Sequence, residues 1–263
     1  MNLPFLPPLN RPIRDWQGKT IWIIGASSGI GAALAQALLR QGAHVILSAR
    51  RLEQLQLVAA NHEQADVLPF DVTDQAAWQG ASQQLQARHP SIDLVIFCAA
   101  KYQPERSWDV DANDAAATLK INLESVYHGL QTVLPHMLKR GSGGLAILAS
   151  VAGYVGLPNA SVYGPSKAAL INLSELLYSD LHQKNINVYL VNPGFVRTEL
   201  TDKNNFDMPA LQTPEQAADA ILQGIARGDF EIHFPKRFTL GLKLLQMLPY
   251  RCRFALIRRF VVA

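Results

Sequence analysis

Cysteine is scarce in this sequence, which has only two, Cys98 and Cys252, among 263 residues. The two stand far apart and lack the spacing of metal ligands, so the composition excludes a disulfide framework and indicates no zinc site. A reducing cytoplasm is the location that this cysteine content favours. Charged residues make up 17% and hydrophobic residues 49%, which is typical of a globular chain rather than a disordered one.

Long apolar runs are also missing. None reaches the roughly 18 residues that a membrane-spanning helix needs. Residues 1–18 contain four prolines and no continuous apolar core, so they do not resemble a secretory signal. We expect them to form an N-terminal arm that is either extended on the surface or disordered.

Acidic residues are absent from residues 232–263, a stretch that holds seven basic residues. The other 17 of the 24 basic residues accompany all 21 acidic ones, so the body carries a formal charge of −4 and the tail +7. Because the positive charge is concentrated in the tail, the sequence argues against nucleic-acid binding by the fold as a whole.

Between these two ends, apolar strand-like runs alternate with longer helical patterns. The runs lack an in/out alternation, so the strands are expected to be buried on both faces of a parallel sheet. Residues 19–232 are therefore predicted to form a single α/β domain, a Rossmann-type doubly wound sheet of about seven strands with helices on both faces. Strands are expected at 20–24, 44–48, 66–70, 92–97, 144–149, 187–191 and, at an edge, 230–234, and helices at 31–41, 52–60, 75–88, 112–139, 162–183 and 214–226.

A glycine-rich turn joins the first predicted strand to the first helix. Gly25 permits the tight turn, while Gly29 and Gly31 let a diphosphate approach bare backbone at a helix N-terminus, where free N–H groups favour anions. A turn of purely structural purpose is the alternative, but the position at the first strand–helix junction favours a nucleotide site. The residues predicted to bind the nucleotide here are Gly25, Ser27, Ser28, Gly29, Ile30 and Gly31.

The end of the second strand carries Arg50 and Arg51 and no acid. An acid at this place usually bonds the ribose hydroxyls of NAD, whereas arginine suits a 2′-phosphate. Arg50 therefore favours NADP(H) over NAD(H), the alternative being two solvated arginines at a helix start. Asp71 and Val72 follow the third strand, where the adenine is expected, although Asp71 could equally cap a helix or close a turn.

Tyr163 and Lys167 are four residues apart on a predicted helix and so share one face. A nearby ammonium lowers the pKa of a phenol, whose ordinary value is near 10. Pro165 fits only if Tyr163 lies in or just before the first helical turn. Such a pair can arise by chance, and its weight comes from Ser150, which follows the fifth strand and can hydrogen-bond a carbonyl oxygen as negative charge develops.

Taken together, these motifs resemble the short-chain dehydrogenase/reductase family over residues 19–223. The resemblance implies that Tyr163 is the general acid in reduction and the base in oxidation, and that Lys167 bonds the nicotinamide ribose and tunes the tyrosine. It further implies that Ser150 polarises the carbonyl and that Asn122 holds a water in a proton relay. The matching motifs are Gly25-x3-Gly29-x-Gly31, Asp71-Val72, Asn122, Ser150, Tyr163-x3-Lys167 and Asn192-Pro193-Gly194.

The resemblance also implies cofactor contacts from two loops. Residues 193–198 would border the nicotinamide, with Thr198 near its carboxamide. After the fourth strand the family usually shows Asn-Asn-Ala-Gly, whereas this chain has Phe97-Cys98-Ala99-Ala100. Both amides are missing, yet the small side chains leave room for the adenine ribose. The cofactor residues expected from these loops are Ala99, Ala100, Pro193, Gly194, Val196 and Thr198.

The expected activity is that of an NADP(H)-dependent oxidoreductase that interconverts a carbonyl and a secondary alcohol on a hydrophobic small molecule. Two alternatives remain open. One is a membrane-associated reductase of the same family acting on a lipid, such as a keto-acyl group. The other is a non-catalytic regulatory protein that binds NADP, which the altered segment after the fourth strand would permit.

Residues 233–263 are expected to form a basic, amphipathic C-terminal tail. Residues 236–263 suit the anionic surface of a membrane, which would place a cytoplasmic protein peripherally at the inner face. Packing of the tail on the body or on a subunit partner is the equal alternative. The resemblance implies a homodimer or homotetramer joined through the helices near 112 and 162, and residues 195–208 are expected to form a flexible lid over the substrate.

Overall fold

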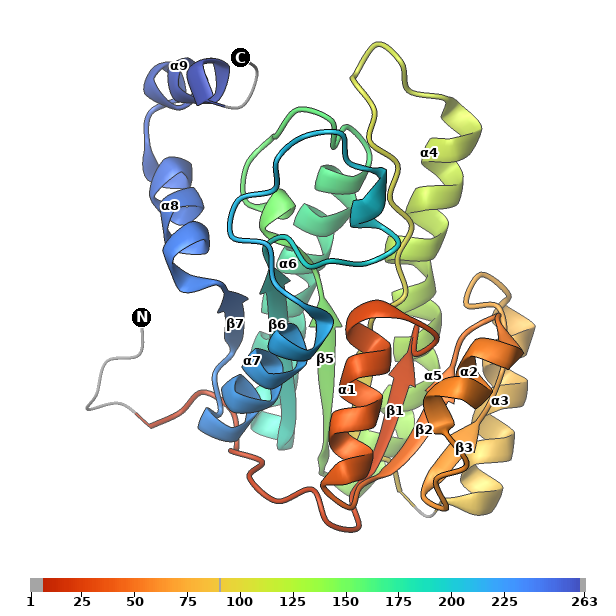
Figure 1. The fold of residues 1–263 in the computed structure, drawn as a ribbon. Coiled ribbons are helices and arrows are strands. Elements are labelled where there is room, and N and C mark those ends of the chain that lie inside the picture. The colour runs from red at the N-terminus through yellow and green to blue at the C-terminus, as the bar shows by residue number, and fades with distance from the viewer. Residues whose placement is uncertain (1–6, 90, 261–263) are drawn as a thin grey trace.

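The structure, a computed structural model, describes residues 7–89 and 91–260. Seven parallel strands form one sheet in the order β3-β2-β1-β4-β5-β6-β7. Helices cover both faces of this sheet (Figure 1), so the predicted doubly wound α/β fold is confirmed. The strands are β1 (Thr20–Ile24), β2 (His44–Ser48), β3 (Ala65–Val67), β4 (Leu94–Phe97), β5 (Gly143–Leu148), β6 (Ile186–Pro193) and β7 (Glu231–Phe234).

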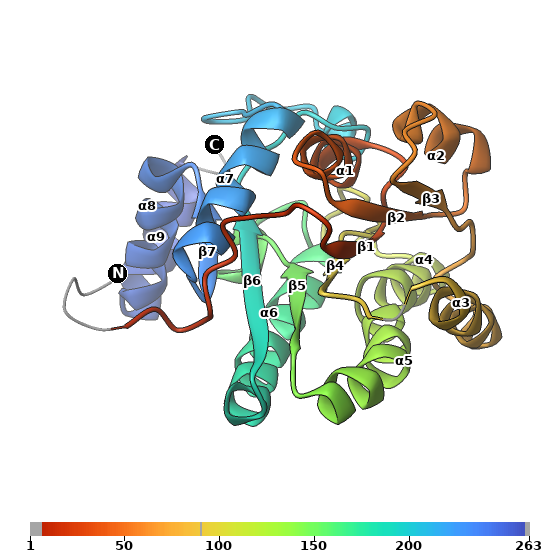
Figure 2. The same ribbon diagram turned by 90° about the horizontal axis from the view of Figure 1, so that it is seen from below.

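Burial on both faces explains why the strands read as continuous apolar runs. All five residues of β1 are buried, and successive side chains point to opposite sides. One layer of helices, with α1, α2 and α7, covers Ile21 and Ile23, whereas α3, α5 and α6 cover Trp22 and Ile24 on the other side (Figure 2). The helices are α1 (Gly29–Arg40), α2 (Leu52–Ala59), α3 (Gln75–Arg88), α4 (Ala112–Leu119), α5 (Ser125–Arg140), α6 (Tyr163–Leu181), α7 (Pro214–Arg227), α8 (Lys236–Met247) and α9 (Tyr250–Phe260).

The long helix expected over 112–139 is interrupted. A π-helical turn, Lys120–Glu124, separates α4 from α5. It carries Asn122, which is fully buried and hydrogen-bonded to residues outside the helix. Single π-helical turns are frequent at functional sites, because the extra residue in the turn redirects a side chain. Periodicity alone did not predict this interruption.

The N-terminal residues 7–18 lie extended along the amino end of the sheet, opposite the end at which the loops are longest (Figure 1). The Asn10 amide donates to the Val188 carbonyl at 2.8 Å and accepts from the Val188 amide at 3.0 Å. The indole of Trp16 is buried. The first six residues of the expected arm lie outside the described residues.

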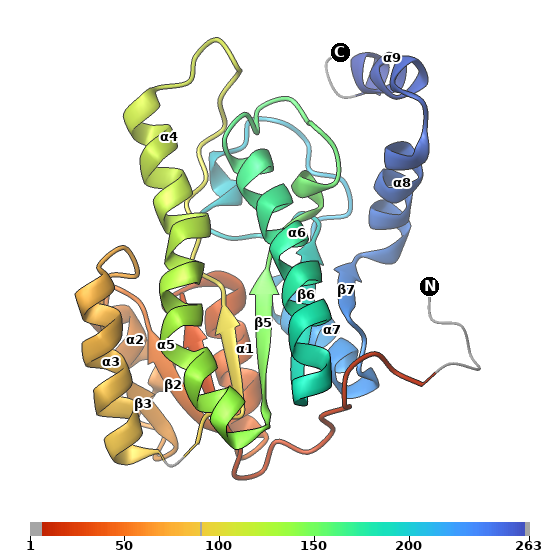
Figure 3. The same cartoon turned by 180° about the vertical axis from the view of Figure 1, so that it is seen from behind.

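The tail forms two helices, α8 and α9, with Pro249 between them. The inner side of α8 packs Phe238, Leu242 and Leu245 against a small apolar cluster that includes Val151 and Tyr154. Both helices lie past the carboxyl end of β7, with α9 beyond α8 (Figure 3). Among the described residues, no helix is long and apolar enough to cross a membrane.

Candidate active site

At Gly25 and Gly31 the turn after β1 has no room for a side chain. At Gly25, where φ is +93°, an added Cβ would lie 2.6 Å from the amide nitrogen of Ala99. At Gly31 it would lie 2.2 Å from the Gly25 carbonyl oxygen. Ser28, at the N-cap of α1, makes no side-chain capping bond. The first N–H groups of α1 are therefore available to an anion at the end of β1.

Two arginines at the end of β2 differ in their contacts. Arg50 is largely exposed and lies 3.9 Å from the carboxylate of Asp71. Arg51 donates to the Ser28 hydroxyl at 2.9 Å and to the Ser27 hydroxyl at 3.3 Å, and pairs with Glu199 at 3.1 Å. Arg51 thus bridges the glycine turn and the loop after β6. Arg51 was not among the residues predicted to bind the cofactor. The sequence signals this role of Arg51 only through its position next to Arg50.

Asp71 closes a turn at the edge of the site. Its carboxylate accepts from the amide of Thr73 at 2.9 Å and from the hydroxyl of Thr73 at 2.8 Å. Burial acts to raise the pKa of Asp71, but these hydrogen bonds and the charge of Arg50 outweigh it, so the pKa is lowered. The turn that was one alternative for Asp71 is present, and the residue lines the cavity at the same time.

The unusual segment after β4 is accommodated by the core. Phe97 is buried, with its ring 6.3 Å from that of Trp78. A Cβ at Gly129 would lie 2.4 Å from the Phe97 ring, so the glycine makes room for the aromatic side chain. Burial raises the pKa of the Cys98 thiol to about 12, which keeps it neutral. The missing amides are thus replaced by hydrophobic packing, and Ala99 keeps its close contact with Gly25.

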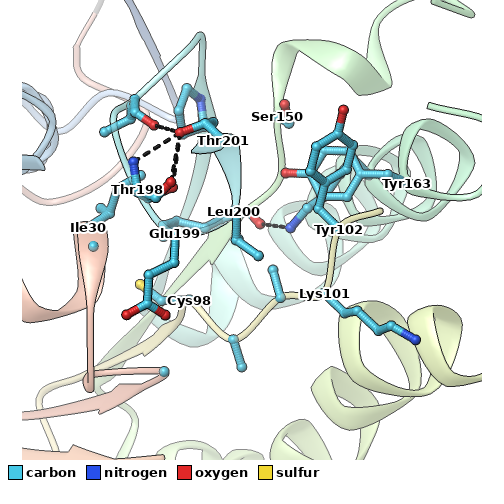
Figure 4. Close-up of a pocket in the computed structure, with 18 of the residues that line it drawn as sticks. Ile30, Cys98, Lys101, Tyr102, Ser150, Tyr163, Thr198, Glu199, Leu200 and Thr201 are labelled. Atoms are coloured by element: carbon cyan, nitrogen blue, oxygen red, sulfur yellow. Dashed lines mark hydrogen bonds between the residues drawn. The ribbon is translucent and has the colours of Figure 1, made fainter. Parts of the chain in front are cut away.

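Tyr163, Ser150 and Lys167 converge at the carboxyl end of β5. Tyr163 is the first residue of α6, as Pro165 requires. The Ser150 side chain lies near the Tyr163 hydroxyl and acts to lower the pKa of that phenol. The Lys167 ammonium donates to the Leu148 carbonyl at 2.7 Å and lies 5.4 Å from the centre of the Tyr163 ring. A phenol, a hydroxyl and an ammonium therefore line the same cavity, and Figure 4 shows Ser150 and Tyr163 in it.

The pKa of Tyr163 differs from the expectation. Burial raises the pKa of Tyr163 to about 12; the Ser150 side chain opposes this shift, and Tyr102 adds to it. The predicted lowering of the tyrosine pKa by Lys167 is therefore wrong for the protein alone, because burial dominates and the ammonium is directed at Leu148. Burial also lowers the pKa of Lys167 to about 8. At neutral pH the phenol keeps its proton.

The Asn122 side chain connects two segments of the site. Its amide nitrogen donates to the Lys101 carbonyl and to the Ser166 hydroxyl, both at 3.0 Å. Its carbonyl oxygen accepts from the Lys101 amide at 2.7 Å. These partners fix the loop after β4 against the first turn of α6, which carries Tyr163. The side chain therefore positions the site, and Asn122 is the one predicted residue that does not line the cavity.

Tyr102 is a site residue that no sequence motif indicated. Its ring meets that of Tyr163 edge-on, with the centroids 4.9 Å apart (Figure 4). Its hydroxyl donates to the Asn204 side chain at 2.8 Å, and the Lys203 ammonium donates to its main-chain carbonyl at 2.8 Å. Residues 195–208, the expected lid, are thus hydrogen-bonded to the far side of the cavity.

These elements enclose one cavity of about 820 Å³ at the carboxyl end of the sheet. One part is bordered by the glycine turn and the arginines, and the other by apolar side chains from the lid, from the loop after Ser150 and from α8. The predicted residues that line it are Gly25, Ser27, Ser28, Gly29, Ile30, Gly31, Arg50, Asp71, Val72, Ala99, Ala100, Ser150, Tyr163, Lys167, Pro193, Gly194, Val196 and Thr198.

A partly buried carboxylate, Glu231 on β7, connects the tail to this cavity. It accepts hydrogen bonds from the Tyr154 hydroxyl and, at 2.9 Å, from the Asn192 amide, and it pairs with Lys243 on α8. Burial acts to raise the pKa of Glu231, but the bonds from Lys243, Tyr154 and Asn192 outweigh it, and the pKa is lowered. Glu231 thereby joins the loop after Ser150, the Asn192-Pro193-Gly194 turn and α8.

A doubly wound sheet with a glycine-built anion turn and a Ser/Tyr/Lys set at its carboxyl end has the architecture of a dehydrogenase. Residues 19–209 match the family model described as short chain dehydrogenase. A curated relative, an uncharacterized oxidoreductase of Myxococcus xanthus (strain DK1622), is 34% identical over 235 residues, which cover 88% of this chain and 93% of the relative. The chain therefore belongs to the short-chain dehydrogenase family and is an oxidoreductase of that family.

Solved structures agree with this assignment. A short-chain dehydrogenase from Sphingobium yanoikuyae in complex with NADPH is 26% identical, with a TM-score of 0.76, over 88% of this chain and 97% of that one. A short chain dehydrogenase/reductase from Burkholderia phymatum in complex with NAD has a TM-score of 0.79 at 23% identity, over 88% and 94% of the two chains. The second likeness concerns the fold alone.

Proposed function

We propose that this protein is an NADP(H)-dependent oxidoreductase that interconverts a carbonyl and a secondary alcohol on a hydrophobic small molecule. The observation that carries the proposal is the convergence of Ser150, Tyr163 and Lys167 on the cavity that the glycine turn also borders. An acid–base phenol beside a nucleotide turn serves hydride transfer, in which a proton must accompany the hydride.

The residues of the glycine turn fit a dinucleotide. The space that a Cβ would fill at Gly25 and Gly31 is already occupied by backbone, so these two positions carry no side chain that would block a diphosphate. The uncapped N-terminus of α1 favours the negative charge. When bound, the nicotinamide supplies or accepts the hydride. Arg50 and Arg51 support a preference for the 2′-phosphate of NADP(H), since both lie at the end of β2 and no acid is there.

Tyr163 delivers the proton. With a pKa of about 12, its phenol is protonated at neutral pH, which is the form that reduction of a carbonyl consumes. As the carbonyl oxygen gains negative charge, Ser150 hydrogen-bonds it and the phenol gives up its proton. The Lys167 ammonium, 5.4 Å from the ring centre, stabilises the phenolate that results.

The substrate side supports a hydrophobic molecule. Leu157, Pro158 and Phe206 line this part of the cavity, together with Phe195 and Phe238, whose rings lie 5.6 Å apart. Such a pocket gains affinity from buried apolar area rather than from charge. A panel of ketones and alcohols of increasing chain length, assayed for turnover, identifies the substrate within this class.

An oligomer joined through α4, α5 and α6 is part of the proposal. Tyr127 and Leu176 on these helices are more than half exposed, at 52% and 56%, and Leu119 is 41% exposed. Exposed apolar side chains on neighbouring helices suit an isologous subunit interface.

The test is Tyr163→Phe, with Tyr178→Phe on the same helix as the matched control. We expect the first variant to lose about 100-fold or more in turnover, since general acid catalysis contributes on that scale, and to bind NADPH as the wild type does. Among the described residues the Tyr178 hydroxyl bonds the arm at Leu9 and lies away from the cavity, so its removal is expected to leave turnover intact. Retained turnover in Tyr163→Phe would reject the catalytic assignment. NADPH binding without turnover of any ketone by the wild type would favour a regulatory protein instead.

A further inference from the structure

The outer face of the C-terminal helices is apolar, although α8 is firmly attached to the body on its inner side. Lys243 pairs with Glu231, and the Thr239 hydroxyl lies 2.6 Å from His233. Arg253 on α9 donates to the Leu245 and Leu248 carbonyls, both at 3.2 Å. The two helices therefore hold a defined position next to the cavity, to which α8 contributes Phe238.

The outward side chains of α8 follow a helical stripe. Leu240, Leu244 and Met247 are 54%, 63% and 81% exposed and lie on successive turns of one face. On α9, Tyr250 and Phe254 are 68% and 51% exposed, with their rings stacked 5.6 Å apart. Exposed apolar side chains gathered over two adjacent helices indicate a surface that is covered in use.

The charge around this stripe indicates what covers it. Residues 232–263 contain seven basic residues and no acid. Lys243 and Arg253 are used within the fold, whereas Lys236, Arg237, Arg251 and Arg258 are exposed beside the apolar side chains. Two copies of this surface meeting about a two-fold axis would bring like charges together. An anionic lipid surface accepts both features, because the apolar side chains enter the acyl boundary and the basic ones meet head groups.

A second segment at the same end of the molecule exposes one aromatic side chain, but its neighbours Asp109 and Asp111 are exposed acids. Trp108, in the loop between β4 and α4, is 77% exposed, and the Arg106 guanidinium lies 5.0 Å from its ring centre. This loop and α9 both extend past the carboxyl end of the sheet, on opposite sides of the loops that cover the cavity (Figures 1 and 3). Tryptophan is enriched where proteins meet the membrane–water interface.

We propose that α8 and α9 form a docking surface for an anionic membrane. Docking holds the cavity mouth at the bilayer, where hydrophobic substrates concentrate; that consequence rests on the proposed function, whereas docking itself does not. In this arrangement no helix of residues 7–89 and 91–260 crosses the bilayer. The outward stripe enters the interface, and the Glu231–Lys243 pair keeps the stripe in register with the catalytic cavity.

The experiment is sedimentation of the full chain with vesicles of phosphatidylcholine alone and of phosphatidylcholine mixed with phosphatidylglycerol. We expect binding to the mixed vesicles only, and weakening by added salt. The variant Leu244→Glu/Met247→Glu is expected to bind about tenfold or more weakly, because two charged side chains replace apolar area at the interface. Leu57→Glu, at a 75% exposed leucine on α2, is the matched control and binds as the wild type does.

A charge-reversed set separates local from overall electrostatics. Arg237→Glu/Arg251→Glu/Arg258→Glu is expected to weaken binding about 100-fold, given about tenfold or less per basic residue. Arg40→Glu/Lys139→Glu/Lys184→Glu changes the net charge equally at exposed sites elsewhere and has a much smaller effect. All variants are first checked for NADPH binding and for thermal unfolding, so that a folding defect is recognised independently of lipid.

Three results would overturn the proposal. The first is equal sedimentation of the wild type and both tail variants. The second is equal binding to neutral and anionic vesicles. The third is that the wild type does not bind vesicles while Leu244→Glu/Met247→Glu lowers the mass in light scattering, which would assign the surface to a second copy of the chain. None of these measurements uses turnover, so a failure of the proposed oxidoreductase activity is distinguishable from a failure of docking.

Discussion

The two halves of the cavity are built by different means. On the side of β1 and β2, glycine backbone packs against backbone, and an added methyl group at Gly31 would meet a carbonyl oxygen at 2.2 Å. On the side of β6 and β7, a carboxylate, a phenol, an amide and an ammonium from four separate segments meet at Glu231. Backbone contacts tolerate no added atom, whereas a side-chain network tolerates changes that keep its charges paired.

The largest effect is therefore expected from Gly31→Ala. The new Cβ cannot be accommodated by rotating a side chain, because its nearest neighbour is the Gly25 carbonyl. We expect a loss of about 3 kcal/mol in the free energy of unfolding, at the upper end of overpacking effects, and loss of measurable NADPH binding. Urea unfolding measures the free energy of unfolding, and NADPH fluorescence measures binding of the cofactor. Gly156→Ala, where nothing lies within 4 Å, is the control and should leave both unchanged.

Lys243→Met tests the other half. This variant leaves the Glu231 carboxylate without its cation. The Lys243 and Glu231 side chains are 30% and 23% exposed, so the pair is not fully buried. We therefore expect the free energy of unfolding to fall by about 2 kcal/mol, less than for a fully buried pair. The NADPH dissociation constant should stay unchanged. Lys243→Arg keeps the charge and should retain most of the stability. A fall in NADPH affinity with Lys243→Met would show that the two halves are not independent.

This difference also explains what the sequence could predict. The bounds of β1, β2 and α3 match the expectation, because local periodicity and turn residues determine them. The glycine turn and the Tyr163–Lys167 pair were accessible because short spacings define them. Tyr102, Arg51 and the Glu231 network were not, since each depends on partners far away in sequence. Burial raises the pKa of Tyr163 in the protein alone, and the degree of burial is a tertiary property that the spacing of Tyr163 and Lys167 does not report.

The same network should make stability depend on pH. Burial and the charges of Lys243 and Lys236 lower the pKa of His233 to about 4. The folded state therefore keeps this histidine neutral, while the unfolded chain takes up a proton below about 6.5. Stability is complete above that value and falls as pH drops towards 4, by about 2 kcal/mol at pH near 4.5.

Urea unfolding at several pH values measures this dependence, with His233→Asn as the comparison. The variant lacks the group, so its stability should fall less over the same window. The lowered pKa of Glu231 adds a separate loss that begins only below the ordinary carboxyl value, near 4.3. Equal pH profiles for the wild type and the variant between about 6.5 and 4.5 would contradict the assignment to His233.

Arg50→Gln tests the side of β1 and β2 with a smaller expected effect. The side chain is exposed and makes only a long contact to Asp71, so the fold should not change. We expect kcat/KM for NADPH to fall about tenfold, which corresponds to losing about 1.4 kcal/mol of charge interaction. The kcat/KM for NADH should stay the same. Steady-state rates with both cofactors measure it. An equal fall with both would mean that Arg50 does not discriminate between them.

The smallest effects are expected from two helical glycines, Gly80 in α3 and Gly241 in α8. Neither has an atom within 4 Å of an added Cβ, and neither has a positive φ. Alanine should therefore stabilise each helix by about 0.5–1 kcal/mol. For Gly80→Ala the gain should appear in the free energy of global unfolding, because α3 packs Trp78 into the core.

For Gly241→Ala the result depends on how tightly α8 is coupled to the sheet. If the Glu231–Lys243 pair and the His233–Thr239 contact make α8 part of the cooperative unit, both alanine variants gain equally in urea unfolding. If α8 opens separately, Gly241→Ala leaves the global transition where it is and raises only the hydrogen-exchange protection of the tail. Equal gains would mean that the β6–β7 side of the molecule, with α8, unfolds together with the β1–β2 side, even though different contacts assemble the two sides.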